Sequence, residues 1–114
     1  MRDTNPLRRK WTRGLPAAIL LAALAAVGAG ADAGARVEIA QHEYRLPKLT
    51  VPAGTAVTWV NRDDDVHTVT STAGLFGSGG LDADDTFTFT FAKPGTYDYF
   101  CKLHPLMTGT VVVQ

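Results

Sequence analysis

The chain of 114 residues contains a single cysteine, and its charges balance to a formal net charge of zero. A lone cysteine excludes a framework of internal disulfides, because such a framework needs cysteines in pairs. The chain also lacks a basic patch of the kind that binds the phosphates of nucleic acid. A chain of this length forms one domain at most. The one thiol therefore needs an explanation other than a disulfide.

Long apolar runs are also scarce, since only residues 15–27 form one. This run is short for a membrane-spanning helix, which needs roughly 20 apolar residues. A basic cluster at residues 8–13 precedes it, and two Ala-x-Ala patterns that end at Ala31 and Ala35 follow it, which is typical of a secretory signal peptide. We predict that residues 1–35 are a signal peptide cleaved after residue 31 or 35, and that residues 36–114 form a periplasmic domain. The alternative is an uncleaved N-terminal membrane anchor.

The rest of the chain reads as short strands separated by turn residues, which predicts an all-β sandwich. In residues 86–91 phenylalanine alternates with threonine, so one face of this strand is expected to be buried and the other wet. Residues 72–85, rich in Gly, Ala and Asp, are predicted to be a long loop. The predicted strands are 36–41, 48–51, 56–61, 66–71, 86–91, 95–101 and 108–113.

The C-terminal segment carries three metal donors at short intervals, Cys101, His104 and Met107. Pro105 opposes a continuous helix there, so these donors converge only if the segment forms a tight loop. His67 supplies a second imidazole from another predicted strand. Two His and one Cys with a weak axial Met are the ligands of blue-copper electron-transfer centres. We predict one copper ion, cycling between Cu(I) and Cu(II), held by His67, Cys101, His104 and Met107.

Each donor has another explanation when it is considered alone. A cysteine or a methionine often fills space in an apolar core, and a single histidine is more often structural or exposed than a ligand. Only the joint order and spacing of the four donors favours a metal site. His42 has no partner pattern, so we assign it no metal role.

Two segments carry a resemblance to the cupredoxins. Residues 97–113, with Cys101-Lys-Leu-His104-Pro-Leu-Met107 followed by Gly-Thr-Val-Val-Val, resemble the copper loop and last strand of that family, and the Cys-x2-His-x2-Met spacing resembles the amicyanin branch. Residues 51–69 resemble the strand that carries the first histidine ligand. The resemblance covers most of the chain after about residue 36. It implies a Greek-key β-sandwich of about seven to eight strands, similar to amicyanin and plastocyanin.

The chain departs from that family at two positions beside the predicted ligands. Thr68 stands where many members have an asparagine that ties the two ligand loops together, so the tie would use the Thr68 hydroxyl or backbone amide. Leu103 stands where amicyanin-like loops commonly have proline. Leu103 keeps an N–H group that proline lacks, and a hydrogen bond from it to the Cys101 sulfur would raise the reduction potential.

The function predicted from these patterns is that of an exported monomer that shuttles single electrons between redox proteins. It is not expected to be an enzyme, since four protein donors leave no open metal position for a substrate. One alternative is a periplasmic copper carrier without redox turnover, which a slow electron self-exchange rate would indicate. Another is a thiol enzyme that uses Cys101 and His104, but no third group that would orient the histidine is visible.

Two acidic groups remain, Asp63-Asp64-Asp65 and the trio Asp82, Asp84 and Asp85. From residue 36 onward the chain has six basic and nine acidic residues, which gives a net charge of about −3. Exposure in solvated loops is enough to explain why these two acidic groups are present. The alternative is a docking patch, because complementary charge speeds the encounter of redox partners.

Overall fold

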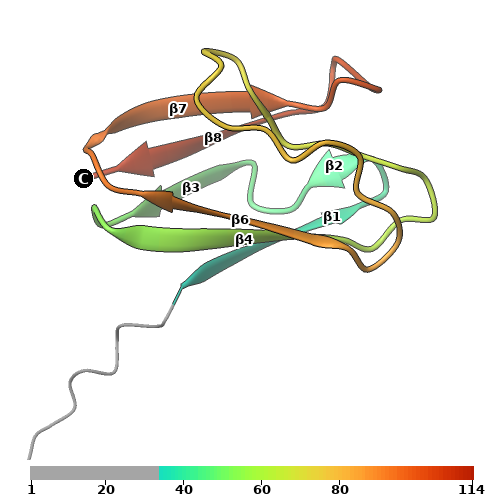
Figure 1. The fold of residues 1–114 in the computed structure, drawn as a ribbon, viewed down its shortest axis with the longest axis horizontal. Helices are drawn as coiled ribbons and strands as arrows, with labels where there is room; N and C mark the ends of the chain where they lie inside the picture. Colours follow the sequence, from blue (N-terminus) through green and yellow to red (C-terminus); the bar gives the residue numbers. More distant parts are fainter. Residues whose placement is uncertain (1–33) are drawn as a thin grey trace, which may run out of the picture.

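The computed structural model describes residues 34–114, so nearly all of the predicted signal peptide lies outside the described residues. Two four-stranded sheets face each other as a sandwich (Figure 1), which confirms the predicted all-β class. No helix within residues 34–114 is long and apolar enough to cross a membrane. The strands are β1 (Ala35–Ala40), β2 (Glu43–Tyr44), β3 (Lys48–Val51), β4 (Thr55–Asn61), β5 (Thr70–Ser71), β6 (Thr86–Phe91), β7 (Gly95–Phe100) and β8 (Thr108–Val113).

Strands distant in the sequence pair within each sheet. The first sheet has the order β2-β1-β4-β6 and the second has the order β3-β8-β7-β5. β1 runs parallel to β4 and β3 runs parallel to β8, whereas the remaining pairs are antiparallel. Each sheet therefore joins an N-terminal strand to strands from later in the chain.

The core between the sheets is largely aromatic. Trp59 on β4 is fully buried and lies 5.3 Å, centroid to centroid, from Tyr99 on β7 in the facing sheet. On β6, Phe91 is buried and Phe87 and Phe89 are half-buried, while the threonines between them are exposed, as the alternation predicts. Burying an aromatic side chain of this kind contributes roughly 1.5–3 kcal/mol to stability, so these residues hold the two sheets together.

The predicted strand 66–71 is wrong for most of its length. Only Thr70–Ser71 form β5, and His67 makes an isolated bridge with Leu81. The backbone N–H of Thr68 donates to the Cys101 sulfur, and that of Val69 donates to the Ser78 hydroxyl. Because side chains take these two donors, a regular ladder of strand hydrogen bonds cannot run through this segment.

The first strand begins one residue earlier than predicted, at Ala35, and β2 was not predicted at all. β1 and β2 are joined by Gln41 and His42, which have φ angles of 56° and 60°. Two successive positive φ values are typical of the tight hairpin turn whose usual residues are Asn-Gly or Asp-Gly. Gln-His gives no such signal in the sequence, which is why this hairpin was missed.

Candidate metal centre

The predicted donors come together in loops at one end of the sandwich. Cys101 directly follows β7, and His104 and Met107 lie in the connection to β8. Backbone hydrogen bonds from Cys101 N to Met107 O (3.1 Å), from His104 N to Cys101 O (3.2 Å) and from Met107 N to His104 O (2.8 Å) close the connection on itself. The expected tight loop is therefore present, with Cys101 and Met107 buried.

Three donors form a cluster that fits a metal ion. The donor atoms of His67, Cys101 and His104 lie within 4.8 Å of one another. Cys101 Sγ is 3.8 Å from His67 Nδ1 and 3.6 Å from His104 Nδ1. A thiolate and an imidazole bound to one ion at about 2.3 and 2.0 Å, with tetrahedral to trigonal angles, would lie roughly 3.5–3.8 Å apart. The cluster thus has the size that a shared ion requires.

His67 is oriented by a carboxylate on its far side. Its ring is fully buried, and Nε2 lies 2.8 Å from Asp63 Oδ2. Because a carboxylate accepts hydrogen bonds, we assign the ring proton to Nε2, which leaves the Nδ1 lone pair facing Cys101. Desolvation opposes ionisation of Asp63, but hydrogen bonds from the backbone N–H groups of His42 and Gln41 and from His67 hold the pKa of Asp63 below its ordinary value. Asp63 therefore stays ionised as an acceptor.

Thr68 ties the two ligand segments together. Its backbone N–H donates to Cys101 Sγ at 3.3 Å, and its hydroxyl accepts a 2.8 Å hydrogen bond from Lys102 N. Both groups expected to replace the family's asparagine are thus used. The hydroxyl of buried Tyr44 donates to Thr68 O, and burial raises the pKa of Tyr44 above its ordinary value. Among residues 34–114 the backbone donor to the sulfur is Thr68, and no hydrogen bond to it comes from Leu103.

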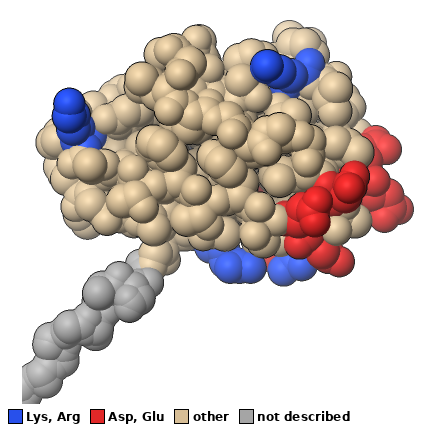
Figure 2. Space-filling model, viewed as in Figure 1, with Lys and Arg blue, Asp and Glu red and all other residues tan. Residues whose placement is uncertain are grey.

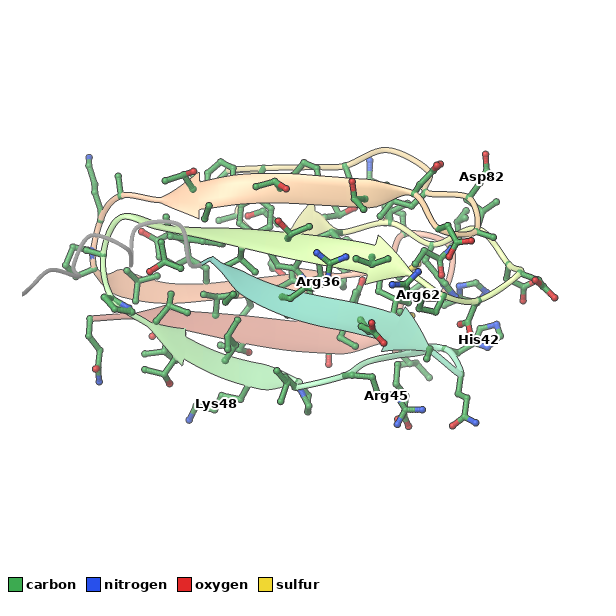
Figure 3. The ribbon with its side chains drawn as sticks, turned by 90° about the horizontal axis from the view of Figure 1, so that it is seen from below. Arg36, His42, Arg45, Lys48, Arg62 and Asp82 are labelled. Carbon is green, nitrogen blue, oxygen red and sulfur yellow. The ribbon has the colours of Figure 1, made fainter. Side chains whose placement is uncertain are left out.

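His42, which has no partner pattern in the sequence, lies against the predicted site. Its ring centroid is 5.0 Å from that of His67 and 4.8 Å from that of His104, with near-perpendicular planes. His42 Nε2 also lies 2.8 Å from Asp65 Oδ2. Figure 3 shows His42 at the end of the sandwich where β1 turns into β2. Only the tertiary fold brings this turn to the site, so no local pattern could have indicated it.

The surface around the site is apolar on one side and acidic on another. His104 is half-buried, and its loop neighbours Leu103 and Leu106 are 55% and 97% exposed. A groove of about 660 Å³ runs beside it, between residues Leu106 to Thr108 of the same loop and residues 42–47. Acidic side chains gather at this end of the molecule (Figure 2). Asp63 and Asp65 lie at this end beside His67 and His42, and Figure 3 shows Asp82 at the same end. Every aspartate of residues 63–65 and 82–85 except Asp63 is exposed.

A two-sheet sandwich with a His–Cys–His cluster in its end loops is typical of the cupredoxins. The chain belongs to the cupredoxin family. The sequence model of the Cupredoxin-like domain matches residues 15–113. The chain is 40% identical over 89 residues to amicyanin from Paracoccus denitrificans, covering 74% of this chain and 68% of that protein. It is 37% identical over 108 residues to amicyanin-alpha from Methylorubrum extorquens, covering 86% and 87%.

A solved structure agrees with these sequence relatives. The chain is similar to the oxidised state of a proline-to-alanine mutant of amicyanin, with a TM-score of 0.69 and 38% sequence identity, covering 73% of this chain and 84% of that one. A plastocyanin from Scenedesmus fuscus is also 33% identical over 98 residues, covering 75% of this chain and 94% of that protein. The expected resemblance to amicyanin and plastocyanin is therefore confirmed.

Proposed function

We propose that this protein is an amicyanin-like blue copper electron carrier whose single copper ion is held by His67, Cys101, His104 and Met107. The observation that carries the proposal is the buried Cys101 sulfur with imidazole nitrogens at 3.6 and 3.8 Å. Thiolate, imidazole and thioether together suit both oxidation states of copper. Bound copper would supply the one-electron chemistry, and the chain's own residues would fix its surroundings.

Those surroundings suit electron exchange rather than catalysis. Cys101 follows directly on β7, and the hydrogen bond from Thr68 N stabilises negative charge on its sulfur. Four protein donors leave no open position for a substrate, and the protein is a carrier, not an enzyme. His104 is the least buried of the predicted ligands. Its exposed neighbours Leu103 and Leu106 would let a redox protein approach through a small, transient interface.

The surroundings of the site also support proposals about partners and location. Redox proteins are the partners of such a carrier, and the acidic residues at the same end favour a partner with a basic surface. The N-terminal basic cluster, apolar run and Ala-x-Ala patterns support export to the periplasm.

Visible absorption spectroscopy tests the assignment of copper to this site. Addition of Cu(II) to the purified protein should give an intense visible absorption band, because charge transfers from the Cys101 thiolate to the ion. Cys101→Ala should abolish the band, since it removes the sulfur. Met107→Ala is the matched control, because the axial bond is weak and its loss should leave copper bound and coloured. A wild-type protein that binds Cu(II) without colour, or a Cys101→Ala variant that keeps the band, would show that the assignment is wrong.

A further inference from the structure

Three groups of potential metal donors lie side by side. The buried group is His67, Cys101 and His104, and the second group is His42, Asp65 and His104. A third group is His42, Asp63 and His67, but its carboxylate already accepts hydrogen bonds from the backbone of Gln41 and His42. Within each group the three donor atoms lie within 4.8 Å of one another. The second group is open to solvent, since the side chains of His42 and Asp65 are 49% and 62% exposed. An ion arriving from solvent therefore meets the second group before the first.

The three imidazoles form a continuous path from the surface to the interior. The ring centroids of His42, His67 and His104 are separated by 4.8, 4.9 and 5.0 Å, so they form a nearly equilateral triangle. His42 is exposed, His104 is half-buried and His67 is fully buried. Because His104 belongs to both the buried group and the second group, one imidazole joins them.

The backbone holds His42 in place at an energetic cost. Positive φ angles are uncommon in residues other than glycine and are disfavoured unless surrounding contacts impose them. Here both N–H groups of the Gln41–His42 turn donate to the carboxylate of Asp63, at 2.7 and 2.9 Å. The same carboxylate accepts the hydrogen bond from His67. One side chain thus fixes the exposed histidine relative to a buried ligand, which an unconstrained surface residue would not require.

We propose that His42, Asp65 and His104 form a surface capture site that binds Cu(II) and transfers it to the buried site. This inference rests on the proposed function, because the buried site is its destination. Imidazole and carboxylate are ligands that suit Cu(II). The neighbouring acidic residues raise the local concentration of cations. Transfer exchanges ligands without redox change: the bonds to His42 and Asp65 break, the bond to His104 is kept, bonds to Cys101, His67 and Met107 form, and the thiol proton of Cys101 passes to water.

The test follows the loading of copper-free protein with Cu(II) by stopped-flow absorption and freeze-quench EPR. In the wild type a colourless Cu(II) species should form first and then convert to the blue form. His42→Asn should remove that species and slow loading by about tenfold or more. Asparagine tolerates a positive φ better than most residues do, so the turn should survive. The final blue spectrum should be unchanged, because the four predicted ligands remain.

Asp65→Asn is the second variant, and Asp64→Asn is its matched control because it removes the same charge from the same loop. Asp65→Asn should slow loading as His42→Asn does, whereas Asp64→Asn should change it by less than about twofold. If His42→Asn loads at the wild-type rate, or if Asp64→Asn is as slow as Asp65→Asn, the capture site is wrong. A wild-type protein that never turns blue would overturn the proposed function itself, and this inference with it.

Discussion

At the scale of single residues, the carboxylate of Asp63 holds two parts of the site together. It accepts hydrogen bonds from Gln41 N, His42 N and His67 Nε2. The sequence placed Asp63 only in an acidic group at the surface, since nothing local shows which carboxylate turns inward. The spacing of Cys101, His104 and Met107 was informative because the loop that joins them is short. The place of His42 depends on contacts between distant segments, so it could not be predicted.

Thr68 provides a residue-scale prediction. Thr68→Val keeps the backbone N–H that donates to Cys101 Sγ but removes the hydroxyl, which accepts from Lys102 N and shares a 2.9 Å hydrogen bond with the Thr70 hydroxyl. The loss of these two hydrogen bonds should lower the free energy of unfolding of the copper-free protein by about 1–2 kcal/mol. The blue absorption band should keep its position. Denaturant unfolding and visible spectra measure the two effects.

Thr68→Ser serves as the control, because serine keeps a hydroxyl at the same position. It should lose less stability than Thr68→Val. Equal losses in both variants would mean that the methyl group of Thr68, and not its hydrogen bonds, is what stabilises the loop.

At the scale of the strands, a sequence prediction was correct where the backbone N–H groups bond to a neighbouring strand and wrong where they bond to side chains. Alternation in 86–91 predicted β6 correctly, because its burial pattern follows from period-2 geometry. The segment 66–71 is also rich in residues that favour strands, yet the N–H groups of Thr68 and Val69 bond to side chains instead of a neighbouring strand. These partners are about 33 and 9 residues away in the chain, so a local pattern cannot reveal them.

The pairing of β7 with β8 gives a strand-scale prediction. Gly109 lies opposite Tyr99, and a Cβ atom at Gly109 would lie 2.4 Å from Tyr99 Cζ. Gly109→Ala should therefore push the Tyr99 ring from its packed position and lower the free energy of unfolding by about 1–3 kcal/mol. Tyr99 also packs 4.7 Å from Tyr44, so the near-UV circular dichroism should change as well.

Gly77→Ala is the matched control for this change. A Cβ atom at Gly77 meets nothing within 4 Å, and this glycine does not have a positive φ. Its substitution should leave the unfolding midpoint almost unchanged. If Gly109→Ala is as stable as Gly77→Ala, the ring of Tyr99 can move aside without cost and the close packing is not a constraint.

At the scale of the whole molecule, the start of the sandwich bears on how the chain is processed. The sequence allows cleavage after Ala31 or Ala35, and β1 begins at Ala35, which pairs with Val57 on β4. Gly34 already packs closely, since a Cβ atom there would lie 2.5 Å from Ala56 O. Cleavage after Ala35 would remove both contacts, whereas cleavage after Ala31 would keep them.

We therefore expect the mature protein to begin at Asp32. Mass spectrometry of the protein isolated from the periplasmic and membrane fractions of its host measures this directly. An N-terminus at Arg36 would show that these first contacts are dispensable. A chain that keeps Met1 and stays with the membrane would instead support the uncleaved anchor.

The predicted ligands come from distant segments of the chain: His67 lies in the connection between β4 of the first sheet and β5 of the second, and Cys101 follows β7 of the second sheet. They are 34 residues apart, so their donor atoms meet only when β5 has paired with β7 and the connection from β4 is in place. A chain that has formed only its local hairpins cannot make the coloured site. The blue absorption therefore reports whether this long-range structure has formed. Colonies expressing destabilised variants could be ranked by eye, without purification or an added dye.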